Sequence, residues 1–188
     1  MKICLVLIAI WVGMLLGCGY EFGPRDRSMP GGYKKIAVPV FKNRTQEPII
    51  ETYFTNSLLG EFQKAKIVEV VPSNLADVIV EGEISQLKSS REGFLEPGDL
   101  SNLPQETYLA TEYEISIECE IRVRRVHDGQ ILWQNLFRGK RVHSAAKITT
   151  PGLNSANPLY NLSARRQNFE LLAQDLMAEA YARMTENF

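Results

Sequence analysis

The clearest pattern in the chain is a strict alternation of apolar and polar residues between positions 112 and 124. The apolar positions are Tyr113, Ile115, Ile117, Cys119, Ile121 and Val123, and between them lie Glu112, Glu114, Ser116, Glu118, Glu120, Arg122 and Arg124. Because successive side chains of a strand point to opposite faces, the alternation predicts a long strand with one buried and one solvated face. Such a strand is typical of an antiparallel sheet covered on one side only.

A turn is expected next, at Asp128-Gly129, and two hairpin registers differ in what they place opposite each other. A two-residue loop would set the apolar Cys119 opposite Arg138. A three-residue loop, with Gly129 in the left-handed conformation, keeps apolar groups on one face and pairs opposite charges on the other. Its pairs are Val123–Trp133, Cys119–Phe137 and Glu118–Arg138. We expect this second register, with Trp133 buried on the covered face of the sheet.

Two segments carry apolar residues at helical spacing. The first runs from an N-cap at Thr45 to about Ala65, and the second from about Leu162 to near Met184. The apolar face of the first helix consists of Ile50, Tyr53, Phe54, Leu58 and Phe62. The stripe of the second consists of Leu162, Phe169, Leu172, Leu176, Ala180 and Met184.

Short strands are predicted at residues 35–41, 67–71 and 78–87. Pro39 cannot donate to a ladder, so the first strand should lie at an edge or end there, and Gly82 indicates a bulge in the third. Residues 88–107 and 144–160 are expected to be polar loops. The order of elements predicts an α+β fold, with two helices packed on one face of a mostly antiparallel mixed sheet of four to five strands. Residues 34–188 would form this single domain.

The N-terminus has the features of an export signal. One positive charge in Met1-Lys2 is followed by an apolar run of about 14 residues, which is short for spanning a bilayer. The run ends in Leu15-Leu16-Gly17-Cys18, which resembles a lipobox, the signal-peptidase II site of bacterial lipoproteins. The resemblance implies a lipoprotein signal peptide at 1–17, lipidation of Cys18, and a lipidated tether at 18–33. The alternatives are an ordinary signal peptide with an incidental cysteine, or a short membrane anchor.

The other cysteines and the residue after Cys18 extend this interpretation. Cys4 would be removed with the signal, which leaves only Cys119 and therefore no disulfide within the mature domain. By analogy with lipoprotein sorting in enteric bacteria, Gly19 indicates the outer membrane. Several acyl chains on one cysteine would give a stable anchor, with the domain on the periplasmic side.

No constellation of catalytic residues stands out. The formal net charge of −1 argues against a nucleic-acid partner, and no phosphate loop, metal motif or nucleophile elbow is present. His127 and His143 are interpreted as solvated structural residues, and Cys119 as a buried inert thiol. The row of glutamates between positions 112 and 120 is interpreted as a solvated face. We therefore expect no enzyme activity, no cofactor and no metal.

Several segments resemble the LPS-assembly lipoprotein family LptE, in the family's order and over essentially the whole chain. They are Cys18-Gly19-Tyr20-Glu21-Phe22, Lys35–Thr45 followed by Glu47-Pro48, Ala76-Asp77 with Glu81-Gly82, Glu112-Tyr113, Asp128-Gly129 with Leu132-Trp133, and the C-terminal helix. The resemblance implies an outer-membrane lipoprotein that partners and plugs the β-barrel LptD, assists its assembly, and binds lipopolysaccharide. No long tail follows the last helix here, so no function of such a tail is expected.

Lys88 and Arg91 are the candidate lipopolysaccharide contacts. They open the expected loop after the third strand, and in the resembled family the corresponding loop carries a basic residue implicated in this binding. Lipopolysaccharide bears phosphates, which lysine and arginine bind through charge-assisted hydrogen bonds. The alternative is two solvated cations, in which case Lys147, Arg165 and Arg166 are the next candidates.

Three other functions remain open. One is an assembly lipoprotein of the curli-secretion type, which the run Ile-Ala-Val-Pro-Val-Phe-x-Asn-x-Thr at 36–45 also resembles. Another is a lipid-anchored enzyme such as a cell-wall hydrolase, which would need a pocket with a perturbed carboxylate. The third is a small-ligand-binding lipoprotein, which would need a deep apolar cavity.

Overall fold

Three long strands, β4 (Val78–Phe94), β5 (Ala110–Arg125) and β6 (Ile131–Ser144), form an antiparallel meander in the computed structural model, which describes residues 27–94, 110–144 and 158–186. Three short strands, β1 (Lys35–Ala37), β2 (Lys42–Asn43) and β3 (Glu69–Val70), complete a six-stranded sheet of order β3-β1-β4-β5-β6, with β2 also paired to β4. The short strands run parallel to their neighbours, so the sheet is mixed.

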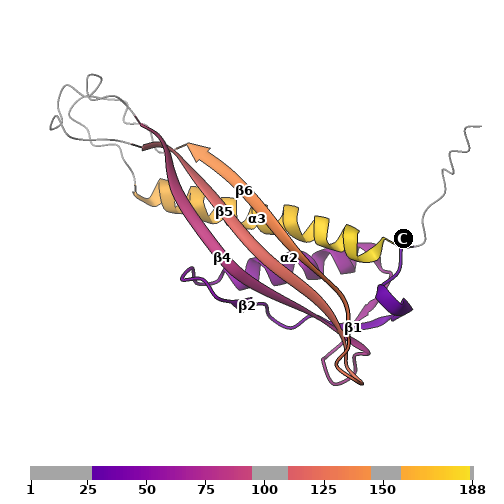
Figure 1. Cartoon of the computed structure of the whole chain (residues 1–188). Coiled ribbons are helices and arrows are strands. Elements are labelled where there is room, and N and C mark those ends of the chain that lie inside the picture. The colour runs from indigo at the N-terminus through magenta and orange to yellow at the C-terminus, as the bar shows by residue number, and fades with distance from the viewer. Residues whose placement is uncertain (1–26, 95–109, 145–157, 187–188) are drawn as a thin grey trace, which may run out of the picture.

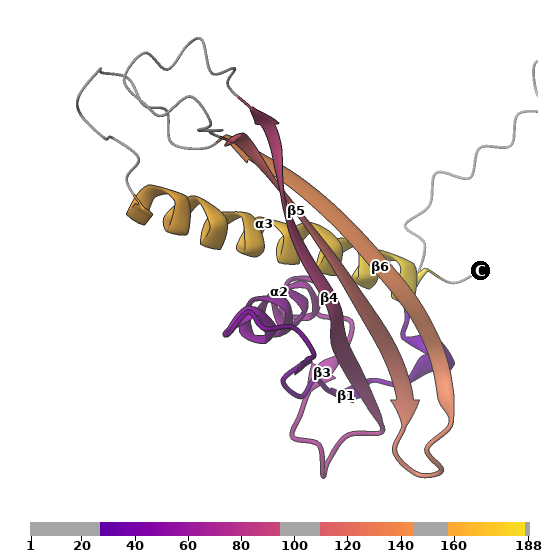
Figure 2. The same ribbon diagram turned by 60° about the vertical axis from the view of Figure 1, so that its left-hand side comes forward.

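Helices α2 (Ile50–Ala65) and α3 (Pro158–Thr185) both lie on the same side of this sheet, and a short 3-10 turn, η1 (Pro30–Gly32), precedes β1 (Figures 1 and 2). The apolar row of β5 is fully buried against the helices, with Ile115, Ile117, Cys119, Ile121 and Val123 at most 1% exposed. The α+β class, the two helices on one face and the mixed sheet are therefore confirmed, with one short strand more than expected.

The hairpin between β5 and β6 has the expected register. Cys119 pairs with Phe137, Glu118 with Arg138, and Val123 with Trp133, and Gly129 has a φ of +72°. The loop itself differs, because the register shifts by one residue between Val123 and Arg124. The last hydrogen bond before the turn joins Arg125 N–H to Gln130 O (2.9 Å). The loop between these two residues therefore has four residues, and not the three that were predicted.

The sequence pattern predicted a bulge at Gly82, and this prediction was wrong. The irregularity in β4 falls between Ile84 and Gln86 instead. Gly82 is instead the place where the Phe41 ring crosses the strand. A Cβ at this position would lie 2.2 Å from Phe41 Cδ2. Glycine is therefore needed here because the Phe41 ring packs directly against the backbone, and not because the strand contains a bulge.

Thr45 is not the N-cap of α2, which begins five residues later at Ile50 after Ile49 in the left-handed conformation. The α region is disfavoured for a residue that precedes proline, and Glu47 precedes Pro48. Thr45 belongs to a turn instead: its hydroxyl donates to Asn43 Oδ1 (2.7 Å) and accepts from Glu47 N–H (3.2 Å).

The α3 stripe is buried as expected except at its start, where Leu162 is exposed near the end of the helix that extends beyond α2.

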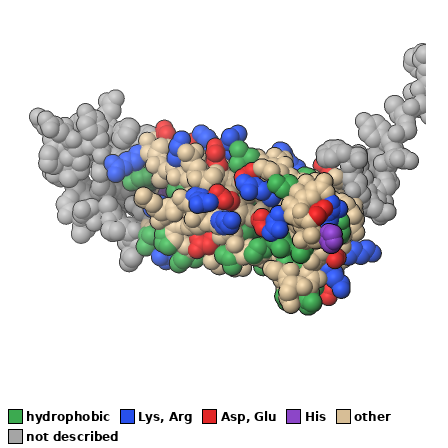
Figure 3. Space-filling view, turned by 60° about the horizontal axis from the view of Figure 1, so that its bottom comes forward, with side chains coloured by type: hydrophobic (Ala, Val, Ile, Leu, Met, Phe, Trp, Pro, Cys, Tyr) green, Lys and Arg blue, Asp and Glu red, His purple; other side chains and the backbone are tan. Residues whose placement is uncertain are grey.

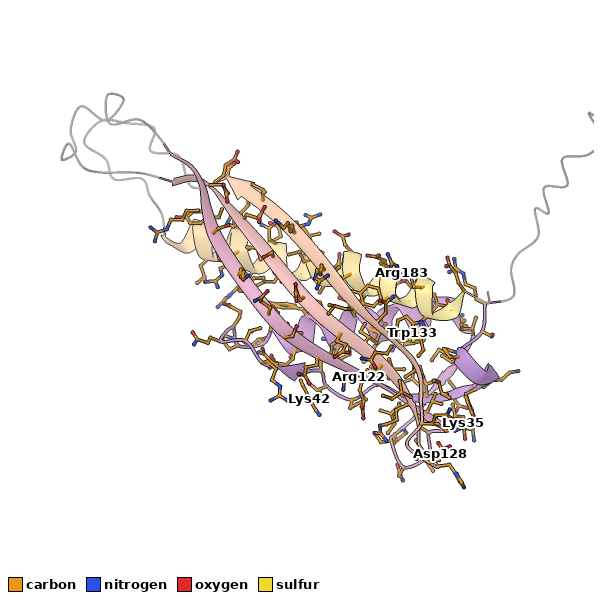
Figure 4. All side chains as sticks on the ribbon, viewed as in Figure 1. Lys35, Lys42, Arg122, Asp128, Trp133 and Arg183 are labelled. Atoms are coloured by element: carbon orange, nitrogen blue, oxygen red, sulfur yellow. The ribbon has the colours of Figure 1, made fainter. Side chains whose placement is uncertain are left out.

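Trp133 is only partly buried, with its ring 6.2 Å from that of Phe137, so the expectation of a buried tryptophan was wrong. It lies near the start of β6, where α3 ends at Thr185 (Figure 4).

Candidate functional site

The face of β4–β6 turned away from the helices, here called the open face, carries closely interleaved charges (Figure 3). Its glutamates form ion pairs with basic residues of the same sheet. These pairs are Glu81–Arg124, Glu114–Lys140 (3.0 Å), Glu118–Arg138 (2.7 Å) and Glu120–Arg122 (2.5 Å). The Arg124 guanidinium lowers the pKa of the Glu81 carboxyl below its ordinary value. Glu114, Glu118 and Glu120 of the row are thus charged partners on a solvated face, where each pair adds little stability, and Glu112 is exposed on the same face.

Lys88 and Arg91 lie in a strand, so their expected place in a loop was wrong. β4 continues to Phe94, with Lys88 opposite Ser116 and Arg91 opposite Tyr113. Residues 88–93 of β4 include no apolar side chain, so this part of the strand has no alternating row by which the sequence could reveal it.

The two candidate cations also point to opposite sides of the sheet. Ser116 belongs to the open face, whereas Tyr113 belongs to the row that continues Ile115 on the helix side. Side chains three positions apart on a regular strand face opposite ways. Both cations are exposed, and neither forms an ion pair with another described residue. The structure therefore does not bring Lys88 and Arg91 together into one site.

A cluster of aromatic and basic groups lies near Arg91 on the helix side. The rings of Tyr113 and His143 are stacked with centroids 5.5 Å apart, and Arg165 lies 5.3 Å from the ring of Phe169. Burial, with the positive charge of Arg165 as a second cause, lowers the pKa of His143. His143 is therefore a partly buried residue rather than a solvated one, whereas His127 is exposed as expected.

Arg165 joins this cluster to a groove of about 530 Å³ between the turn before α2, strand β4 and the start of α3. The groove is lined by Arg44, Thr45, Gln46, Glu47, Ser85, Gln86, Leu87, Ser89 and Arg165. Arg165 Nη2 lies 2.6 Å from Glu47 Oε2, while its Nε is buried without a partner. Two guanidinium groups and several hydroxyls here offer donors to a phosphate or a sugar. Sequence reasoning missed the groove, because no local spacing links Arg44 to Arg165.

The other candidate cations and the cysteines add no second site. Arg166 is exposed on α3, whereas Lys147 and Cys18 lie outside the described residues. Cys119 is buried, and burial raises the pKa of its thiol to about 12, which makes it a poor nucleophile as expected. Within the described residues, no cluster of three or more His, Cys, Asp and Glu side chains has the arrangement of a metal site.

None of the described helices combines the length and the apolar character needed to cross a membrane. The other described hollows are also lined largely by polar side chains. One, of about 480 Å³, lies at the β5–β6 turn, and the other, of about 670 Å³, lies between α2 and α3.

Comparison with known proteins gives one family match and several similar folds. The family model described as "LptE: Lipopolysaccharide-assembly" matches residues 33–186. A Xanthomonas campestris protein of the DUF330 family superimposes with a TM-score of 0.53 at 10% identity, over 86% of this chain and 92% of that one. A homolog of the neuraminyllactose-binding hemagglutinin from Helicobacter pylori gives 0.53 at 8% identity, over 89% and 90%. These two similarities show the fold alone. No curated protein sequence matches the chain.

Proposed function

The chain belongs to the LptE lipopolysaccharide-assembly family, and on this premise we propose that it is a lipid-anchored outer-membrane protein that partners and plugs an LptD-like β-barrel. In this role it assists the assembly of lipopolysaccharide at the cell surface, from the periplasmic side. The observation that carries the proposal is the family match over almost the whole described domain, from residue 33 to residue 186.

The chemistry of the described surface supports a role in binding rather than catalysis. Glu114, Glu118 and Glu120 of the candidate carboxylate row are held in ion pairs, and the Cys119 thiol is buried with a raised pKa. These three hollows are open and lined largely by polar residues, unlike the deep apolar cavity of a small-ligand carrier. The open face and the arginine-lined groove instead offer charged groups to a large polar partner.

The partnership is tested by co-purification. The mature lipoprotein, carrying a C-terminal affinity tag, is extracted from membranes in mild detergent, and the co-purifying proteins are identified by mass spectrometry. We expect a large outer-membrane β-barrel in near-equal amount. A matched bait, another tagged outer-membrane lipoprotein expressed at the same level, should not capture it. Recovery of the chain without a barrel, from membranes shown to contain one, would contradict the proposal.

For lipopolysaccharide, we propose that Lys88 and Arg91 contact its phosphates. Because they lie on opposite faces of the sheet, each is replaced singly, as Lys88→Asp and Arg91→Asp. Loss of a charge-assisted contact should weaken binding by about 1.5–3 kcal/mol, and added salt should weaken the wild type more than the variant. Lys42→Asp is the matched control, since Lys42 is an exposed lysine on the short strand β2 (Figure 4).

The pattern of loss locates the contact. A loss with Arg91→Asp alone places it on the helix side, near Arg165, and a loss with Lys88→Asp alone places it on the open face. Unchanged affinity in both variants would move the site away from this end of β4, with Arg165 and Arg166 as the next positions to test. Barrel binding measured on the same variants shows whether the partner surface has been disturbed.

A further inference from the structure

Strand β6 lies at one edge of the sheet, and none of the described strands pairs with its outer side. In the order β3-β1-β4-β5-β6 its one neighbour is β5, and both ribbon views show it as the outermost of the three long strands (Figures 1 and 2). The turn η1 packs beside the beginning of β6, where a Cβ on Gly31 would lie 3.7 Å from Leu132 Cδ1. We call the part beyond it, residues 134–144, the free edge.

A local hydrogen bond shows which backbone groups of the free edge point outward. The N–H of Leu136 donates to the side chain of the preceding residue, at Asn135 Oδ1 (2.8 Å). Alternate residues of an antiparallel strand direct both backbone groups away from the partner strand. The N–H and C=O groups of Arg138, Lys140 and Val142 therefore also face outward. A row of such groups, two residues apart, is a template for one more strand.

The free edge is protected by charge rather than by shape. It contains no proline, and its pairing with β5 is unbroken, since the register shift lies nearer the turn. It carries three cations, Arg138, Lys140 and Arg141, and no acidic residue. Antiparallel pairing of two β6 strands around Gly139 would bring the cations of both copies together, which is unfavourable. The free edge therefore disfavours a second copy of this chain and favours an acidic strand.

Two of these cations stand at the outer margin of the open face. The side chains of Arg138 and Lys140 are 66% and 69% exposed, whereas their partners on β5, Glu118 and Glu114, are 31% and 25% exposed. Each cation thus has a carboxylate on its β5 side and is open to solvent on its outer side. A strand added there would place its own side chains beside these cations, where acidic groups are favoured.

We propose that the free edge of β6 accepts an extended, acidic segment of the barrel partner as an added strand. Its acidic side chains pair with Arg138 and Lys140, and apolar ones lie beside the exposed Leu136 and Val142. The segment is a loop, because the wall strands of a closed barrel have both edges paired. The inference rests on the proposed partnership with a barrel and adds where and how the barrel is held.

Amide hydrogen exchange tests the added strand on the wild-type lipoprotein, free and in its barrel complex in the same mild detergent. Exchange is quenched after set times, and each amide is read by NMR on the dissociated, isotope-labelled chain. The amides of Arg138, Lys140 and Val142 should exchange about tenfold or more slowly in the complex than in the free chain. Those of Phe137 and Gly139, which by the same alternation face β5, should be slow in both.

Two results of this measurement would overturn the proposal. Fast exchange of the three outward amides in the complex would show that no strand is added. Slow exchange of these amides in the free chain would show that another segment of this chain already covers the edge.

Paired substitutions at Lys140 separate the backbone from the side chain. Lys140→Ala and Lys140→Pro both remove the cation, but only proline also removes the outward N–H, which an edge strand tolerates. Each variant is co-expressed with a differently tagged wild-type copy, and the share of each in the barrel complexes is measured. The share of Lys140→Pro should fall about fivefold below that of Lys140→Ala, the effect of one lost hydrogen bond. Equal shares for two variants of equal stability in urea would overturn strand addition.

Carbodiimide cross-linking identifies the chemistry of the added segment, because it joins an amine to a carboxylate in direct contact. In the intact complex Lys140 should link to an aspartate or glutamate of a barrel loop, whereas Lys42, on β2 beyond β4, should not (Figure 4). Links from Lys140 to Glu114 alone would overturn the acidic partner. A wild-type chain that captures no barrel overturns both this inference and the proposed function. Capture without protection of the outward amides overturns the inference and leaves the partnership intact.

Discussion

A methyl group at Gly82 tests the packing that holds the N-terminal strands against the long meander. In Gly82→Ala the new Cβ would lie 2.2 Å from Cδ2 and Cε2 of Phe41 and 2.4 Å from its Cζ, so the ring cannot keep its place. The ring is only 3% exposed, and the backbone N–H of Phe41 donates to the buried Thr55 Oγ1 (3.0 Å). Moving the ring therefore also strains the bond that fixes this segment to α2.

The size of the effect follows from these contacts. Expelling one phenylalanine ring from the core removes about 2–3 kcal/mol of burial. Losing the buried hydrogen bond adds about 1 kcal/mol. We expect Gly82→Ala to lower the free energy of unfolding by about 3–4 kcal/mol, measured by urea denaturation of the mature chain followed by circular dichroism.

Two further variants make the measurement specific. Gly60→Ala in α2, where an added Cβ meets nothing within 4 Å, should raise stability by about 0.5–1 kcal/mol through helix propensity. In the Gly82→Ala background, Phe41→Ala should cost far less than it does in the wild type, because the ring has already been displaced. A loss below about 1 kcal/mol for Gly82→Ala alone would refute this account of the packing.

Four other predictions follow from particular residues. Trp133→Ala should cost about 2 kcal/mol in urea denaturation, less than the 3–5 typical of a buried aromatic, because its ring is only partly covered; a loss as large as that of Phe137→Ala would show fuller burial. Gly129→Val should cost about 1–2 kcal/mol, since φ is +72° and only backbone strain opposes the change; no change in the urea midpoint would speak against the left-handed turn. The pKa of His143 is lowered from its usual 6.5, so the unfolded chain binds its proton first and stability should fall as pH drops below about 6.5; His143→Phe should remove this part of the pH dependence, and an unchanged dependence would exclude His143 as its source. Cys18→Ala should yield an uncleaved precursor that takes up no labelled fatty acid, and wild-type labelling of this variant would exclude the anchor.

The sequence predicted those parts of the fold where one face of an element is buried. Alternation along β5 gave the strand, the covered side and the hairpin pairs, because a register error of one residue would have exposed Ile115 and its row to water. The same logic failed beyond Leu87, because β4 has no apolar residue from Lys88 to Gly93 and so no alternation to recognise. It also failed at Gly82, where the reason for glycine is a ring from another segment, 41 residues earlier in the chain.

The candidate site was predicted less well than the fold. Basic residue type led to Lys88 and Arg91, but only the strand geometry shows that they face opposite ways. The groove that joins Arg44 and Arg165 is a product of tertiary packing, since it brings together the turn before α2, the middle of β4 and the start of α3. The residue pattern within a single segment cannot predict that these three segments lie together. The resemblance of the sequence predicted the family but not these contacts.

The most direct test of the proposed function is the delivery of newly made lipopolysaccharide to the cell surface when the chain is depleted in its native host. Pulse-labelled lipopolysaccharide is followed by its accessibility to a surface-modifying reagent, with a plasmid-borne wild-type copy as the control. We predict that surface delivery falls as the protein disappears and recovers with the wild-type copy. Undiminished delivery in cells shown to lack the protein would contradict a role in lipopolysaccharide assembly.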